Sequence, residues 1–189
     1  MSDTVTIRNG IDVEQLLTTI DAIKDDAPLG TFTFRAASRW EDGTHNVGEI
    51  GRFVQASRED ESRTEPFRLE GDEPPVLLGS NKGPNAVELL LQALGFCYAV
   101  GYVANAAARG IDLTRMDYEL EGDIDVRTFL GLEGPRAGFT EIRVKGRVTS
   151  PNATKQQLVE LCQYVQDTSP VRDSLANPIP VTTTLEVVP

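Results

Sequence analysis

The chain has 189 residues, and its 29 acidic side chains outnumber its 18 Lys and Arg to give a formal net charge of −11. This length is typical of one domain, and a hydrophobic fraction of 40% is too high for a disordered chain. The charge argues against partners that are polyanions, namely nucleic acid and anionic membranes. Only four of the basic residues are Lys, which suits either an ordinary acidic protein or one adapted to high salt.

The first half of the chain predicts one short helix followed by a strand hairpin. Residues 12–24 repeat apolar side chains at helical spacing and predict an amphipathic helix. Residues 31–40 predict a strand, Asp42-Gly43 favours a tight turn, and residues 46–55 predict the returning strand. The sequence then predicts a polar loop over 57–65, a short strand over 66–70 and an irregular segment over 72–84.

Residues 84–109 predict the longest helix. Asn85 is a suitable N-cap, Gly110 suits the position after the last turn, and residues 89–108 carry no charge. An uncharged stretch of this length raises the alternative of a membrane span, but Asn105 and the polar flanking sequence favour a helix buried in protein. A helix that is apolar on all sides needs packing partners all round, and a second subunit would supply them.

The second half of the chain predicts two further strands, two helices and a final strand. Residues 115–126 and 139–148 alternate as strands do, and residues 154–166 predict an amphipathic helix. A short helix over 170–177 and a strand over 181–188 complete the chain. This order of elements indicates an α+β fold with antiparallel sheets rather than a doubly wound one.

Few residues carry reactive chemistry. Cys97 and Cys162 are too few for a disulfide scaffold, and without a visible secretory signal we expect a cytoplasmic protein with reduced thiols. A single histidine, His45, excludes a His-rich metal site, and no phosphate-binding or dinucleotide-binding loop occurs. Asp123 and Asp125 are more typical of a solvated strand face than of a metal site, so we expect no metal or cofactor.

Cys97 lies in the middle of the long helix, with Gly101 one turn further on. The missing side chain at Gly101 would let another backbone or a small substrate approach the sulfur. Spacing alone favours an inert core cysteine, because a thiol in mid-helix gains nothing from a helix N-terminus. A reactive Cys97 would need an Arg or His from elsewhere in the fold to stabilise the thiolate.

Two separate blocks resemble one known family. The segment GPNAVELLLQALGFCYAVGYVANAAARGIDL, residues 83–113, is similar to the central helix of the OsmC/Ohr hydroperoxide-resistance proteins, with Cys97 at the position of the peroxidatic cysteine. The tail SPVRDSLANPIPVTTTLEVV, residues 169–188, resembles the second block of that family. Together with the hairpin, the resemblance covers about residues 30–189 of one domain, 1–189, and leaves residues 1–29 as an N-terminal helical extension.

The resemblance implies an OsmC-like fold, an intertwined homodimer with a long buried central helix, and an active site at each end of the interface. It also implies that the Cys97 thiolate attacks a peroxide O–O bond and becomes a sulfenic acid. A second cysteine then forms a disulfide with it, and an external thiol reductant resets the enzyme. In the family an Arg and a Glu orient the thiolate.

The second cysteine of the family pattern is missing. Its position is occupied by Ser169, which with Pro170 is well explained as the start of a helix. Cys162, seven residues earlier, either replaces the missing thiol or packs in the core, and core packing is favoured.

The groups that would orient Cys97 also depart from the pattern. The family glutamate aligns with Val87, and Glu88 is turned by about 100° from that direction. Glu88 also lies about 13.5 Å from Cys97 along a straight helix, so contact needs a partner subunit or a break. Arg39 is a better candidate than Arg35 for the arginine. His45 is either a neighbour of the thiol or a surface residue, and the surface is favoured.

Two functions follow as hypotheses. The first is a thiol-dependent peroxidase that reduces organic or inorganic hydroperoxides, with Cys97 as nucleophile and Arg39, His45, Glu88 and Cys162 as candidate site residues. The second is a non-peroxidatic relative that binds a small apolar ligand at the dimer interface, since the family Glu and second Cys are both missing.

Overall fold

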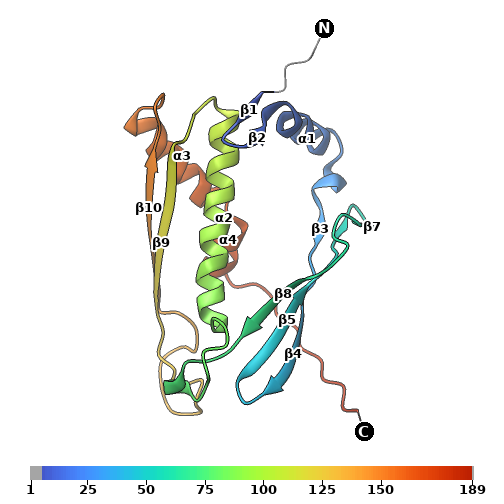
Figure 1. Cartoon of the computed structure of the whole chain (residues 1–189), viewed down its shortest axis with the longest axis vertical. Helices are drawn as coiled ribbons and strands as arrows, with labels where there is room; N and C mark the ends of the chain where they lie inside the picture. Colours follow the sequence, from blue (N-terminus) through green and yellow to red (C-terminus); the bar gives the residue numbers. More distant parts are fainter. Residues whose placement is uncertain (1–5, 189) are drawn as a thin grey trace.

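The computed structural model describes residues 6–188, and its centre is the helix α2, Ala86–Ala108. Asn85 begins α2 through a capping box, in which its side chain accepts a hydrogen bond from the Glu88 N–H while the Glu88 carboxylate accepts one from the Asn85 N–H. The predicted long helix is therefore confirmed. α2 runs along most of the molecule, with β9 and β10 on one side of it and α1, β3 and β7 on the other (Figure 1).

One side of α2 forms the core with the C-terminal half of the chain. α2 packs against β9 (Arg115–Asp123), which pairs antiparallel with β10 (Glu141–Thr149), and against α3 (Lys155–Thr168) and α4 (Pro170–Ala176). The strands predicted over 115–126 and 139–148 and the two helices of this half are confirmed, although the first strand ends at Asp123 rather than at residue 126. The buried core residues are Leu94, Tyr98, Tyr102, Ala106, Ile111, Leu161 and Val165.

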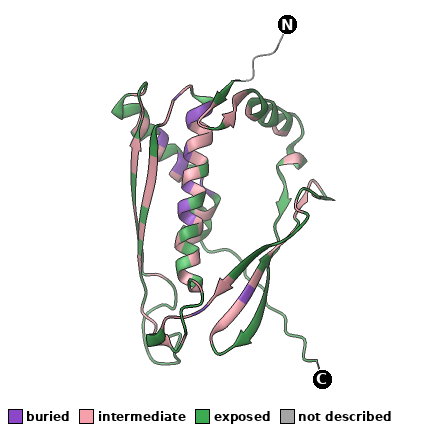
Figure 2. Ribbon diagram, viewed as in Figure 1, coloured by how far each residue is buried: buried purple, intermediate pink, exposed green. Residues whose placement is uncertain are grey.

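The opposite side of α2 is open within one chain. Phe96 and Val100, one helical turn apart, are 65% and 70% exposed, and Figure 2 shows the buried residues of α2 gathered on the other side. One chain therefore covers α2 on one side only, and the burial of its other side by a second subunit stays a prediction. α2 is long and apolar enough to cross a membrane, but the core helix of a soluble protein can have the same length and composition.

A second sheet holds the predicted hairpin. β4 (Ala37–Asp42) and β5 (His45–Ile50) pair antiparallel around the Asp42-Gly43 turn, and β8 (Phe67–Gly71) pairs with β5. The two long predicted strands are each interrupted, so their outer parts form a small separate sheet. That sheet consists of β3 (Phe32–Thr33), β6 (Val54–Gln55) and β7 (Arg58–Glu59).

The N-terminal segment forms a short ladder and the predicted amphipathic helix. β1 (Ile7–Arg8) pairs with β2 (Ile11–Asp12), and α1 (Val13–Asp25) follows with Asp12 as its N-cap. One-turn 3-10 helices occur at Ala27–Gly30 and Pro75–Leu77. No residue of α1 is buried. Residues 1–5 of the expected extension, and residue 189, lie outside the described residues.

The predicted final strand over 181–188 is wrong. In the described chain residues 178–188 pair with no strand, and Figure 1 shows them leaving α4 as an extended tail. Val181, Leu185 and Val187 are 81%, 89% and 84% exposed. The alternating pattern indicates that the segment could form a strand. Pairing also needs the free edge of another strand, and no residue near the segment in sequence indicates where that edge lies.

Candidate functional site

The two aspartates considered from the sequence as metal ligands, Asp123 and Asp125, each pair with an arginine. Asp123 pairs with Arg143, and Asp125 pairs with Arg127 through contacts as short as 2.8 Å. Among residues 6–188 no group of three or more His, Cys, Asp or Glu side chains is placed to hold a metal ion. These aspartates belong to an ion-paired surface.

Cys97 and Ser169 form the contact around which the candidate site is built. Cys97 is half-buried on α2, and its Sγ lies 3.1 Å from the Oγ of Ser169. Ser169 is only 4% exposed because it forms the junction at which α3 ends and α4 begins. Its Oγ also accepts a hydrogen bond from the backbone N–H of Arg172 at 3.2 Å. The predicted N-cap role of Ser169 is confirmed, and the sequence missed its contact with the sulfur.

The close approach of α2 and α3 places Ser169 beside Cys97. Gly101 faces Val165 of α3, and a Cβ at Gly101 would lie 3.2 Å from Val165 Cγ1. Leu161, 0% exposed, fills the core one turn before Val165 on the same helix. Tyr102 anchors α3 as well, since its hydroxyl donates to the Leu158 carbonyl at 2.8 Å. The small residue at Gly101 therefore admits a neighbouring helix rather than a substrate.

A cavity of about 540 Å³ lies between α2, β10 and α4, and its lining residues do not include Cys97 or Ser169. Leu94 and Tyr98 line it from positions that flank Cys97 in sequence, and Phe139 adds a further apolar wall. Arg172 lines the cavity with its side chain while its backbone N–H caps α4 at Ser169. Burial raises the pKa of Tyr98, so its phenol stays protonated at neutral pH.

Cys162 packs against the hydrophobic core from α3. Its sulfur lies 3.6 Å from Gln166 Nε2, and both cysteines are free. It lines a second cavity of about 480 Å³ together with Tyr102 and Tyr118. Burial raises the pKa of Tyr118. Within the described residues no hydrogen bond or disulfide joins Cys162 to Cys97.

Arg39 and His45 lie on the same face of the β4–β5–β8 sheet. Arg39, whose side chain is 70% exposed, binds Glu41, and this contact holds the pKa of the Glu41 carboxyl below its usual value. His45 Nε2 lies 2.6 Å from Glu70 Oε2, and the His45 side chain is only 16% exposed. Neither residue hydrogen-bonds to Cys97 among the residues described. His45 is partly buried, so it is not the exposed surface residue that the sequence favours.

The Glu88 side chain takes part in the capping box at the start of α2. Its carboxylate accepts the Asn85 N–H at 2.8 Å, and in the described chain it makes no hydrogen bond with Cys97. Val87, at the position of the family glutamate, has no ionisable group, so the single chain brings no carboxylate to the sulfur from this end of α2. The structure thus unites Cys97 with Ser169, but not with Arg39, His45, Glu88 or Cys162.

Asp72 is a structural residue that the sequence did not indicate. It is 4% exposed and accepts hydrogen bonds from the Thr44 hydroxyl at 2.6 Å and from the N–H groups of Glu73, Ser80 and Lys82 at 2.9, 3.0 and 3.1 Å. These hydrogen bonds hold the pKa of Asp72 well below its usual value, and the bond from Thr44 has the largest effect. Asp72 thereby ties the hairpin turn to the loop that leads into α2.

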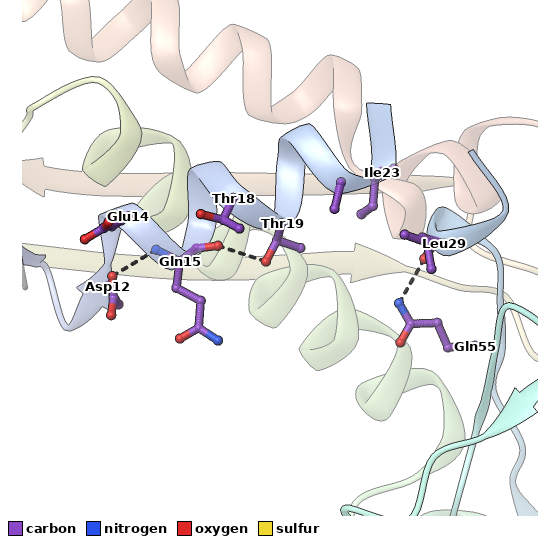
Figure 3. A pocket seen from close by; sticks show the side chains of 9 residues that line it. Asp12, Glu14, Gln15, Thr18, Thr19, Ile23, Leu29 and Gln55 are labelled. Atoms are coloured by element: carbon purple, nitrogen blue, oxygen red, sulfur yellow. Dashed lines mark hydrogen bonds between the residues drawn. The ribbon is translucent and has the colours of Figure 1, made fainter. Parts of the chain in front are cut away.

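A further cavity, of about 520 Å³, lies along α1 far from either cysteine in sequence. Figure 3 shows its lining, which includes Gln15, Thr19, Ile23 and Leu29, with Gln55 donating to the Leu29 carbonyl at 2.9 Å. Within the part of the chain that the structure describes, no cysteine lines this cavity. We therefore place the candidate site at Cys97 rather than here.

Comparison with known proteins identifies the family. The family model for OsmC-like proteins matches residues 79–184, more than half of the chain, whereas no curated protein matches. An OsmC-like protein from Mycoplasma pneumoniae is 17% identical, with a TM-score of 0.54 over 76% of this chain and 87% of that one. An OsmC-like protein of unknown function from Vibrio cholerae is 11% identical, with a TM-score of 0.56 over 75% and 92%.

A third similar structure is an organic hydroperoxide resistance protein from Legionella pneumophila. It is 14% identical, with a TM-score of 0.51 over 76% of this chain and 88% of that one. At such identities the structures support the shared fold, and the family model supplies the match in sequence. The fold predicted from the two sequence blocks is confirmed, and this chain belongs to the family of OsmC-like proteins.

Proposed function

We propose that this protein is a thiol-dependent peroxidase with Cys97 as its nucleophile. The observation that carries the proposal is the half-buried Cys97 on the central helix of an OsmC-like chain, with the Ser169 hydroxyl 3.1 Å from its sulfur. The two cysteines differ in this contact, because the Cys97 sulfur meets a buried hydroxyl at 3.1 Å whereas the Cys162 sulfur lies 3.6 Å from Gln166 Nε2. The Legionella relative, named for organic hydroperoxide resistance, supports the same chemistry.

The reaction transfers one oxygen atom to the sulfur. The Cys97 thiolate attacks the terminal oxygen of the hydroperoxide, an S–O bond forms, and the O–O bond breaks. The leaving alkoxide takes a proton and departs as an alcohol, or as water when the substrate is hydrogen peroxide. Cys97 is then a sulfenic acid, and the peroxide has received two electrons.

An external thiol resets the enzyme in this proposal. One reductant thiolate attacks the sulfenic sulfur and releases water, and a second attacks the mixed disulfide to return Cys97 and a reductant disulfide. Ser169 cannot form a disulfide, and Cys162 faces the core cavity beside Tyr102 and Tyr118. Resolution by Cys162 is the alternative that the experiment below separates.

Intact-mass spectrometry after one equivalent of peroxide, with and without a sulfenate trap, tests the proposal. We expect a trapped adduct on the wild-type chain and on Cys162→Ser, and none on Cys97→Ser. A loss of two mass units without an adduct would instead indicate a Cys97–Cys162 disulfide. Equal rates of peroxide consumption by wild type and Cys97→Ser would exclude the peroxidase.

We also propose that the working form is a cytoplasmic homodimer. The exposed Phe96 and Val100 on α2, and the unpaired tail with Leu185 89% exposed, support a second copy as the missing partner. Light scattering at micromolar concentration should give a mass near twice 20.6 kDa, and Phe96→Asp should reduce it to that of one chain. A monomeric wild type would refute this part of the proposal.

Binding of a small apolar ligand is the second candidate function. The cavity of about 540 Å³ between α2, β10 and α4, with Leu94, Tyr98 and Phe139 in its lining, favours it. A ligand retained through purification, combined with a Cys97 that peroxide leaves unmodified, would support this function. A trapped sulfenate would favour the peroxidase.

A further inference from the structure

The hydroxyl of Ser169 contacts two groups among the described residues, the Arg172 N–H and the Cys97 sulfur. A serine hydroxyl offers one O–H donor and two lone pairs. A lone pair of Ser169 Oγ is engaged by the Arg172 N–H, which can only donate, at 3.2 Å. The one other hydrogen-bond partner of Oγ among the described residues is Cys97 Sγ, at 3.1 Å. When Cys97 is a thiolate it can only accept, so the Ser169 hydroxyl must be the donor in this contact.

We propose that Ser169 is a positioning residue that donates a hydrogen bond to the Cys97 thiolate and so favours the reactive form. This inference rests on the proposed peroxidase function and assigns a role to the residue that replaces the second cysteine. The N–H of Arg172 polarises the hydroxyl, and the hydroxyl passes that polarisation to the sulfur. A thiolate can only accept, so the same contact that is weak for a thiol becomes charge-assisted for the anion.

Burial strengthens this contact. Ser169 is 4% exposed, so water does not compete freely for its hydroxyl. Its position is fixed from two sides, because it ends α3 and begins α4 with no intervening residue. The donor is therefore already in place before the thiolate forms, and no side chain has to be ordered to meet the charge.

A simple capping role makes a different prediction, which the choice of variants exploits. Loss of an N-cap lowers the stability of the chain but leaves the chemistry of Cys97 unchanged. Ser169→Gly keeps most of the capping, since Gly is tolerated at this position, and it removes the hydroxyl. Thr154→Ala is the matched control, because Thr154 caps α3 by accepting from the Gln157 N–H and has no contact with Cys97. Ser169→Thr restores a hydroxyl.

The measurement is the pH dependence of Cys97 alkylation by iodoacetamide, followed by peptide mass spectrometry so that Cys162 is scored separately. For Ser169→Gly we expect the midpoint to move to higher pH and the rate near pH 7 to fall about three- to tenfold, a tenfold change corresponding to one pH unit. Thr154→Ala should keep the wild-type profile, and Ser169→Thr should recover most of it.

An unchanged profile in Ser169→Gly would overturn the inference and leave Ser169 as a helix cap. If Ser169→Gly does not fold, Ser169→Ala compared with Thr154→Ala carries the same test, because both remove a cap and only one removes the donor. The outcome is separate from that of the peroxidase proposal. A wild-type chain without a trappable sulfenate refutes the peroxidase, whereas the alkylation profile still reports on Ser169.

Discussion

Leu161→Ala should destabilise the chain more than any exposed truncation on the same helix. Leu161 is 0% exposed and packs in the cluster with Tyr98 and Tyr102. The substitution removes three carbon atoms, which at about 0.8 kcal/mol each gives about 2.4 kcal/mol of lost burial. The residual cavity adds to this, so we expect about 3–4 kcal/mol. For a chain of 189 residues this corresponds to a fall in melting temperature of about 6–16 °C.

The assay is thermal unfolding followed by circular dichroism, at one fixed chain concentration because association would shift the midpoint. Val159→Ala is the control: Val159 lies on the same helix and is 58% exposed, so its truncation should change stability by less than about 0.5 kcal/mol. Equal midpoints for Leu161→Ala and Val159→Ala would refute the assignment of the α2–α3 contact as the core that supports the Cys97 site.

Two further predictions concern the loop before α2 and the helix contact. Asp72 has a lowered pKa in the folded chain, so its stabilising contribution is present above the ordinary value of 3.8 and is lost as the pH falls below it. Asp72→Asn should therefore lower the urea midpoint at neutral pH by an amount that shrinks below about pH 4; a difference that persists unchanged to about pH 2 would contradict this. Gly101→Ala places a Cβ 3.2 Å from Val165 Cγ1, so Val165→Ala should restore part of the stability that Gly101→Ala loses. In a double-mutant cycle we expect a coupling free energy of about 0.5–3 kcal/mol, and strictly additive effects would argue against the close approach.

Local signals in the sequence predicted most of the elements. The Asn85 cap, the Asp42-Gly43 turn and the apolar spacing of the helices each depend on residues close together in the chain, and each is confirmed. Ser169 was also recognised as a cap for this reason. What such signals cannot supply is the identity of a distant partner.

The missed features all depend on distant contacts. The tail alternates like a strand, but its partner edge is not specified by any nearby residue. Asp72 binds N–H groups eight and ten residues away, in a loop with no periodic pattern. Cys97 and Ser169 are 72 residues apart, so only the packing of α3 on α2 could reveal their contact.

The tail that follows α4 has a consequence for how far one chain can extend. Residues 178–188 leave the body of the molecule without pairing, and eleven extended residues span about 36–40 Å. The 23 residues of α2 measure about 35 Å from end to end. The described tail is therefore about as long as the central helix. A second chain that pairs with it could be contacted along a line as long as α2, so the tail alone could contribute a large share of an interface between two copies.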